Sequence, residues 1–261
     1  RRCYHSSNYR RVIPVTLFAM RTLFISDLHL SDKRPDLIRA LVHFLEHETH
    51  DCSELYLLGD IFDAWIGDDF YHPALQPAIE ALAACQAKGI SVYLQHGNRD
   101  FLMGNELAKR VNATLLPEAK TITLPDSSQA LVMHGDQLCT EDAEYQSFRT
   151  MVRNPAWQQM FLNKPLEERI EIARSLREQS QLENADKSYE IMDVNEDAVS
   201  AALSNANTNL LIHGHTHRPA KHTLSELNAT RIVLGDWDTD VWYLDCTKAG
   251  CNLKSYPLPS A

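Results

Sequence analysis

The stretch that decides the fold runs from residue 22 to residue 29 and reads TLFISDLH. Its apolar and β-branched residues predict a buried strand over residues 22–26. Asp27 and His29 stand at the end of this strand, and because residues i and i+2 of an extended chain lie on the same side, both side chains can converge on one cation. Asp-x-His after a strand is also a common polar loop, so its meaning depends on the rest of the chain.

The same combination, an apolar strand with polar residues at its carboxyl end, occurs four more times. The polar segments are Gly59-Asp60, Gly97-Asn98-Arg99-Asp100, His134-Gly135-Asp136 and Gly214-His215-Thr216-His217. Strands of an α/β sheet bring their carboxyl ends to a common rim, where such sheets bind ligands. We therefore expect one cleft that gathers seven candidate metal ligands: Asp27, His29, Asp60, Asn98, His134, His215 and His217.

The types of these side chains indicate a pair of metal ions. A carboxylate such as Asp60 can bridge two cations ~3.5–4 Å apart. Asn98 offers an amide oxygen, and the histidines offer neutral imidazole nitrogens. A mixed oxygen and nitrogen set without thiolates favours Mn²⁺ or Fe²⁺ over a structural zinc site.

The first half of the chain alternates strands and helices. Strands over residues 54–58 and 90–95 follow helical patterns over residues 35–48 and 73–88, which predicts βαβ units and a largely parallel sheet covered by helices. Gly89 is placed to cap the second helix.

The second half differs, because residues 141–204 have a helical pattern without strands. Two strands around a turn at residues 125–128 precede this segment. The strands that follow it are predicted over residues 210–212, 221–226, 230–234, 241–244 and 252–255. We expect one α/β domain over residues 20–261 with a helical insertion at about 141–204.

Residues 1–19 have a short apolar stretch that contains Pro14 and is preceded by arginines. We interpret them as a leader or upstream segment rather than a secretion signal, with Met20 as the natural start.

Composition narrows the function classes. The chain has 261 residues, a formal net charge of −10 and no apolar run of the ~18 residues needed to cross a bilayer. Non-specific nucleic-acid binding usually needs a basic balance instead, so no nucleic-acid partner is expected. The six cysteines are scattered without a CxxC pair, which predicts reduced thiols in a cytosolic protein.

Taken in order, the five segments resemble the calcineurin-like metallophosphoesterase family, whose pattern is D-x-H, G-D, G-N-H-[DE], H and G-H-x-H. This resemblance implies a sandwich of two mixed β-sheets flanked by helices (αββα), in which the helical insertion is a lid that caps the active site. It also implies two Mn²⁺ ions per chain. One ion would be held by Asp27, His29, Asp60 and His217, and the other by Asp60, Asn98, His134 and His215, so that Asp60 is the bridge.

The chain departs from the family pattern at Arg99. Many members have histidine there, assigned as the acid that protonates the leaving oxygen, whereas an arginine does not release its proton near neutrality. A phosphoric anhydride needs no such acid, because its leaving group is already stable as an anion. Arg99 would then neutralise charge that develops on the diphosphate, which favours a pyrophosphatase over a phosphomonoesterase.

With this arginine and the flanking residues 26–30, 59–69 and 97–102, the chain is similar to the branch of the family that hydrolyses an amphiphilic UDP-sugar lipid in the lipid A biosynthesis of Gram-negative bacteria. The resemblance implies catalytic roles for Asp60, Asn98, Arg99 and His215. It implies substrate contacts from Asn98, Arg99, Asp142, Ser180, Asn184, Lys187 and His215. We expect a monomer that is cytoplasmic and peripheral on the cytoplasmic face of the inner membrane.

The insertion suggests further hypotheses. Its aromatic and aliphatic residues are consistent with helix packing or with a groove for acyl chains. Six basic residues could meet anionic lipid headgroups or form a solvated face: Arg149, Arg153, Lys164, Arg169, Arg174 and Arg177. Two other functions remain open, a nuclease or cyclic-nucleotide phosphodiesterase on the same scaffold, and a scaffold protein without catalysis. Arg99 and the net charge argue against the first, and the complete ligand set argues against the second.

Overall fold

Two β-sheets face each other in the computed structural model, which describes residues 21–185 and 193–259, the side chains of residues 180–185 excepted. The first sheet has the order β11-β10-β1-β2-β3-β4. Its strands are β1 (Thr22–Ile25), β2 (Glu54–Leu58), β3 (Ser91–Gln95), β4 (Ala113–Leu115), β10 (Asp240–Thr247) and β11 (Gly250–Pro257). The second sheet has the order β5-β6-β7-β9-β8. Its strands are β5 (Ala119–Thr123), β6 (Gln129–Met133), β7 (Leu210–His213), β8 (Ala220–Leu224) and β9 (Ala229–Val233).

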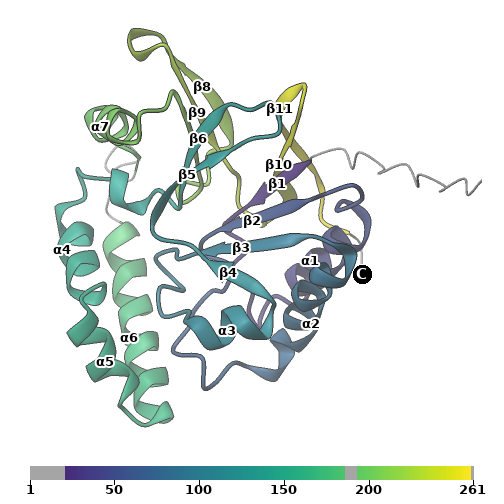
Figure 1. Ribbon diagram of the computed structural model, residues 1–261. Helices are drawn as coiled ribbons and strands as arrows, with labels where there is room; N and C mark the ends of the chain where they lie inside the picture. The colour runs from purple at the N-terminus through teal and green to yellow at the C-terminus, as the bar shows by residue number, and fades with distance from the viewer. Residues whose placement is uncertain (1–20, 186–192, 260–261) are drawn as a thin grey trace, which may run out of the picture.

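Both sheets are mixed. Strands β1 to β4 are parallel and β10 pairs antiparallel with β1, whereas β6, β7 and β9 are parallel and are flanked by antiparallel β5 and β8. The expected αββα class is confirmed (Figure 1). The largely parallel sheet predicted for the first half is confirmed by β1 to β4, and the later strands divide between both sheets.

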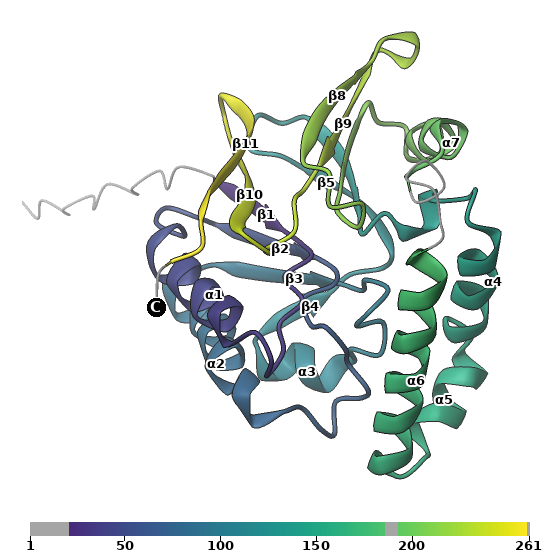
Figure 2. The same ribbon diagram turned by 180° about the vertical axis from the view of Figure 1, so that it is seen from behind.

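Helices α1 (Pro35–His47), α2 (Gln76–Ala84) and α3 (Asn105–Arg110) cover the outer face of the first sheet (Figures 1 and 2). Helix α1 begins with Pro35 and an acidic first turn, both favourable at a helix start, and it buries one apolar face that includes Leu41 and Phe44. The segment predicted as one helix over residues 73–88 has a 3₁₀ turn at each end of α2. Gly89 ends it in the left-handed conformation, with φ 78°, as expected for a C-terminal cap.

The core between the sheets is apolar and aromatic. Phe24 stacks on Tyr56 at 5.0 Å, and Tyr56 stacks on Tyr93 at 4.5 Å. From the second sheet, Val132 and Ile212 pack against this group and are fully buried. This packing fixes the two sheets face to face, so the loops after β1, β2 and β3 lie beside those after β6 and β7.

The helical segment forms two separate structures. Helices α4 (Ala143–Val152), α5 (Pro155–Leu162) and α6 (Leu166–Ala185) stand side by side at one edge of the molecule (Figures 1 and 2). Helix α7 (Glu196–Ala206) instead packs Val199 and Leu203 against the second sheet. The part of the insertion that can cap a site is therefore α4 to α6, which we call the lid.

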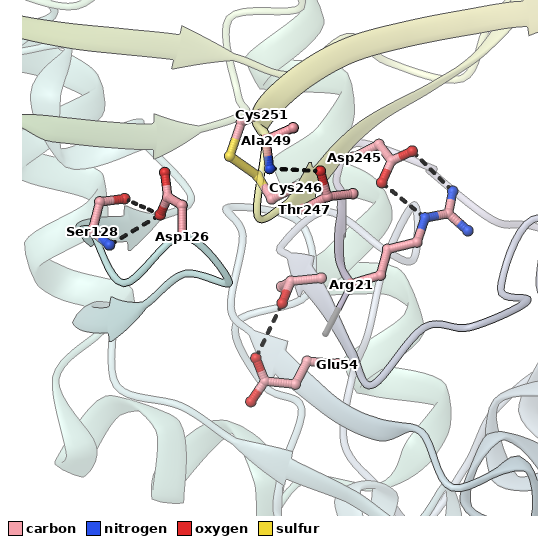
Figure 3. The surroundings of a disulfide bond; sticks show 10 residues. Arg21, Glu54, Asp126, Ser128, Asp245, Cys246, Thr247, Ala249 and Cys251 are labelled. Carbon is pink, nitrogen blue, oxygen red and sulfur yellow. Dashed lines mark hydrogen bonds and ion pairs between the residues drawn. A yellow bond between two sulfur atoms is a disulfide. The ribbon is translucent and has the colours of Figure 1, made fainter. Parts of the chain in front are cut away.

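The prediction that all cysteines are reduced thiols is wrong for one pair. Cys246 and Cys251 form a disulfide between β10 and β11, shown in Figure 3. The hairpin register places these two residues directly opposite each other, a proximity that scattered cysteines do not reveal in the sequence. Cys52, Cys85 and Cys139 are free and buried, and Cys3 lies outside the described residues. Among the helices that the structure describes, none has the length and apolar character to span a bilayer.

Candidate metal centre

The seven candidate ligands lie together where the carboxyl ends of β1, β2, β3, β6 and β7 meet. Hydrogen bonds between loops of different strands hold this rim. The backbone N–H of His215 donates to Oδ2 of Asp27 at 3.0 Å, and that of Gly214 donates to the carbonyl of His134 at 2.8 Å. Loops far apart in the chain are thereby fixed to one another.

Three of the ligands form one group on the side of β1. Nε2 of His217 lies 3.3 Å from Oδ1 of Asp27 and 3.3 Å from Nε2 of His29. The Oδ2 atom of Asp27 accepts a hydrogen bond from Ser26, so the other carboxylate oxygen faces the two imidazoles. Asp27, His29 and His217 are close enough together to ligate one ion.

A second group lies on the side of β6. Oδ1 of Asn98 is 3.0 Å from Nε2 of His134 and 3.0 Å from Nδ1 of His215. The other ring nitrogen of His134, Nδ1, bonds the carbonyl of Leu58 at 2.8 Å, which leaves Nε2 directed at the group.

Asp60 stands between the two groups. Its Oδ2 is 3.9 Å from Nε2 of His29, and its Oδ1 is 3.8 Å from Nε2 of His134. Each carboxylate oxygen therefore faces a different group, which is the arrangement that a bridging ligand requires. Asp27, Asp60 and His134 are also mutually close enough for one ion, so Asp27 reaches toward both groups.

The backbone at this rim is unusual. Five of the ligands have positive φ values, namely Asp27, His29, Asp60, His215 and His217, with φ of 56°, 47°, 51°, 69° and 54°. Residues other than glycine rarely adopt this conformation, which costs of order 1–3 kcal/mol each. Surrounding hydrogen bonds and packing must therefore maintain it.

Asp100 supplies part of that support. Its buried carboxylate accepts hydrogen bonds from the backbone N–H groups of Ile61 and Gly97, both at 2.7 Å. Asp100 thereby joins the loop of Asp60 to the loop of Asn98. Gly97 is required at its position, because a Cβ atom there would lie 2.1 Å from Oδ1 of Asp60.

The electrostatics of the rim fit bound cations. Burial raises the pKa of Asp60 to about 7, with Asp100 and Asp27 adding to the effect. Burial lowers the pKa of His29 to about 3 and that of His215 to about 4, so both imidazoles are neutral donors. His217 has the opposite shift. Burial would lower its pKa, but hydrogen bonds with Asp236 and Asp27 raise that pKa to about 10, and this cation lowers the pKa of Asp27 despite that residue's burial. The buried carboxylates thus attract positive charge to the rim, which divalent metal ions would supply in place of the His217 proton.

The sequence model of the family described as calcineurin-like phosphoesterase matches residues 20–219, a span that contains all five ligand loops. The chain belongs to the calcineurin-like phosphoesterase family. Its curated relatives include proteins named UDP-2,3-diacylglucosamine hydrolase from Cellvibrio japonicus, which is 48% identical over 92% of this chain and 100% of its own length, and from Tolumonas auensis, which is 46% identical over 93% and 99%. A third, of the same name from Chromohalobacter salexigens, is 49% identical over 84% of this chain and 89% of its own length.

In this phosphoesterase Arg99 lies beside the bridging position. Its backbone N–H donates to Oδ1 of Asp60 at 2.8 Å, and its positive charge contributes to the low pKa of His29. In the described part of the chain, no hydrogen bond or ion pair engages its side chain, which is only half-buried. The guanidinium is thus available to an anion at the rim.

The expected substrate contacts have mixed outcomes. Asp142 is the N-cap of α4, where its side chain accepts a hydrogen bond from the N–H of Tyr145 at 3.0 Å. Ser180 and Asn184 are in α6, but their side chains lie outside the described residues, as does Lys187. Sequence reasoning missed Tyr145, whose ring stacks over His215 at 6.1 Å. Its spacing from Arg149 and Arg153, one helical turn apart each, was the available signal.

The hypothesis that the basic lid residues face anionic headgroups or solvent is wrong for four of the six, whereas Arg174 is exposed to solvent and Lys164 is partly exposed. Arg169 pairs with Asp69, and Arg177 pairs with Asp63. Arg149 and Arg153 pair with the carboxylates of Asp136 and Glu118. Lys164, just before α6, pairs with Glu168 of that helix, and Arg174 pairs with Glu171 of its own helix. Four of the six therefore attach the lid to the core through ion pairs with carboxylates outside the lid.

Proposed function

We propose that this phosphoesterase hydrolyses the diphosphate bond of UDP-2,3-diacylglucosamine, a step of lipid A biosynthesis, with two Mn²⁺ ions per chain. The products are UMP and 2,3-diacylglucosamine 1-phosphate. The observation that carries the proposal is the state of Arg99. This residue places a permanent positive charge where the family pattern has a leaving-group acid, and it has no ion-pair partner among the described residues. The relatives at 46–49% identity are named UDP-2,3-diacylglucosamine hydrolase, which supports the same substrate.

Different residues at the rim would bind the metal ions and the diphosphate. Asp27, His29, Asp60 and His217 would hold one ion, and Asp60, Asn98, His134 and His215 the other. When bound, the ions polarise the phosphoryl oxygen and lower the pKa of the attacking water. Arg99 binds the diphosphate oxygens and offsets the charge that develops on them.

The atoms balance without a protonating side chain. Water attacks the phosphorus nearer the uridine, and the bond from that phosphorus to the bridging oxygen breaks. The new oxygen remains on UMP, the bridging oxygen leaves with the acylated sugar phosphate, and the protons of the water pass to the product phosphates or to solvent. That leaving group is stable as an anion, so the absence of the family's histidine beside Asn98 does not block the reaction.

The lid supplies apolar surface for the acyl chains. The large apolar side chains that the described residues expose include Met151, Met160, Leu162 and Ile170, all of them in α4 to α6. Exposed apolar surface can mark a site for an apolar ligand or a membrane. We propose that the acyl chains bind here and that the protein, as a monomer, works peripherally at the cytoplasmic face of the inner membrane, in Gram-negative bacteria.

The test compares three substrates with purified protein and Mn²⁺. We expect release of UMP from UDP-2,3-diacylglucosamine, with one oxygen from ¹⁸O-labelled water found in the UMP by mass spectrometry. Deacylated UDP-glucosamine should be a poor substrate, and p-nitrophenyl phosphate should not react measurably. Hydrolysis of the monoester alone would refute the proposal, and equal rates with and without acyl chains would favour a general nucleotide pyrophosphatase instead.

A further inference from the structure

Helix α4 presents one face to the metal centre. Tyr145, Arg149 and Arg153 are spaced at i, i+4 and i+8, so they lie in a row along the helix. The hydroxyl of Tyr145 donates to Oδ2 of Asp136 at 2.6 Å, and Nε of Arg149 donates to the same oxygen at 2.8 Å. Asp136 is two residues after the ligand His134, so α4 is fixed directly to that loop.

Arg153 extends this row to a second ligand loop. Its Nη2 donates to the carbonyl of Gly97 at 2.9 Å, and its Nη1 is 3.1 Å from Glu118. The guanidinium also lies over the ring of Phe101, 5.5 Å from its centre, and its side chain is only 12% exposed. Three contacts fix the position of this guanidinium, and it in turn fixes the orientation of the carbonyl to which it donates.

The carbonyl that Arg153 contacts is part of the peptide bond between Gly97 and Asn98. The N–H of Gly97 is held by Asp100 and its carbonyl by Arg153, so the orientation of the next residue is determined from both sides. The amide oxygen of Asn98 must reach two imidazoles at once, His134 and His215. A small rotation of the Gly97 peptide would break this convergence.

The contacts of α4 go to one side of the centre. They reach Gly97, Asp136 and, through the ring of Tyr145, His215. Within residues 21–179 and 193–259, no hydrogen bond, ion pair or ring contact joins this row to Asp27, His29 or His217.

We propose that Arg153 is a positioning residue that orients Asn98 and so makes the metal subsite of Asn98, His134 and His215 depend on the docking of the lid. The proposal rests on the proposed function only in taking these residues to hold a metal ion. The other subsite, with Asp27, His29 and His217, does not depend on Arg153.

Arg169 provides a matched control on the same lid. Its side chain is 4% exposed, pairs with Asp69 and donates to the carbonyl of Ile66 at 2.7 Å. It therefore fixes α6 to the core at Ile66 and Asp69, six and nine residues after the ligand Asp60. Arg153, in contrast, contacts the residue next to Asn98. If the lid only needs to be docked, Arg153→Gln and Arg169→Gln should have the same effect on metal binding.

The experiment measures Mn²⁺ binding to the full chain by electron paramagnetic resonance, with amide hydrogen exchange of residues 95–102 in the metal-free protein as a second readout. For Arg153→Gln we expect one Mn²⁺ bound as in the wild type, a second bound about 10-fold more weakly, and a correspondingly weaker signal from the spin-coupled pair. Exchange around Gly97 should be faster. Arg169→Gln should change neither readout, and Arg153→Lys should restore binding in part, because one ammonium cannot reproduce the fork.

Two results would overturn the proposal: wild-type binding of both ions by Arg153→Gln, or equal weakening of the second ion by Arg169→Gln. If Arg153→Gln does not fold, Glu118→Gln releases the other end of the guanidinium, and unchanged affinity for the second ion there would count equally against it. A wild-type protein that binds two Mn²⁺ but does not hydrolyse the UDP-sugar lipid would refute the proposed function and leave this inference standing.

Discussion

Replacing Asp100 with asparagine tests how far the ligand loops depend on one buried carboxylate. The side chain is fully buried. Its Oδ2 accepts hydrogen bonds from the backbone of Ile61 at 2.7 Å and Phe62 at 3.3 Å. Its Oδ1 accepts them from Gly97 at 2.7 Å and Asp60 at 3.3 Å. Four donors of two ligand loops thus meet at two oxygens.

Asparagine retains only one of those oxygens, and its NH₂ group would point at N–H donors. Two buried backbone donors lose their acceptor, each at a cost of about 1–3 kcal/mol. Burial raises the pKa of Asp100, so removal of its charge returns some of that cost. We expect a net loss of about 2–4 kcal/mol, a large part of the roughly 5–15 kcal/mol by which a domain is stable.

Urea unfolding of the metal-free protein, followed by circular dichroism, measures this loss without any contribution from bound ions. The matched control is Asp126→Asn, because Asp126 accepts a backbone hydrogen bond from Ser128 at 2.9 Å in an exposed turn. A surface change of this kind should cost less than about 0.5 kcal/mol. If Asp100→Asn unfolds at the same urea concentration as the control, Asp100 does not hold the loops.

Four further outcomes follow from the structure. Arg99→Ala should bind two Mn²⁺ ions like the wild type while turnover falls about 10²–10³-fold, and unchanged turnover would remove the argument from the missing acid. Dialysis against EDTA should abolish activity and lower Tm, and Mn²⁺ at 100 times its Kd should restore about 2.7 kcal/mol for each ion bound; a Tm insensitive to Mn²⁺ would contradict the metal centre. Burial alone would raise the pKa of Asp245, but its hydrogen bonds with Arg21 at 2.8 and 3.0 Å, drawn in Figure 3, and its pairing with Lys254 leave that pKa lowered. The stabilisation from these pairs is therefore present above the unfolded-state pKa and is lost as pH falls through the folded-state pKa. Asp245→Asn should therefore be less stable than the wild type at pH 7, with a gap that closes toward low pH, and a gap independent of pH would be inconsistent with this origin. Cys246→Ser should cost about 2 kcal/mol, the loop-closure value for so short a separation, and wild type in excess reductant should match it; no difference between oxidised wild type and variant would show that the bond is absent.

The parts of the fold that the sequence predicts are those set by neighbouring residues. The ligand loops could be found because each follows a short apolar strand, as in the run from residue 22 to residue 29. Helix α3 and strand β4 were not predicted, since six and three residues are too few to show a period, and Gly104 before α3 offers no side-chain cap. The left-handed backbone of the ligands also has no local signal, because it is imposed by hydrogen bonds from other loops.

Contacts between distant segments account for the remaining errors. Arg169 and Asp69 are 100 residues apart, and Arg177 and Asp63 are 114 apart, so a basic lid helix has the same sequence pattern whether it faces solvent or core carboxylates. The position of α7 on the second sheet depends likewise on Leu211 and other residues of separate strands. Pattern identifies these elements, but only the assembled sheets determine their partners.

The charged groups around the rim determine how an anionic substrate could bind there. The lid arginines Arg149, Arg153, Arg169 and Arg177 all have carboxylate partners, so none remains to bind a diphosphate, whereas Arg99 has no such partner among the described residues. The carboxylates of Asp27 and Asp60 would by themselves repel an anionic substrate. A pair of divalent ions would exceed their combined charge and, with Arg99, would make the rim positive where the proposed diphosphate would lie. Substrate binding should therefore depend on the same ions as the reaction, and the lid, through Arg153, would then affect both.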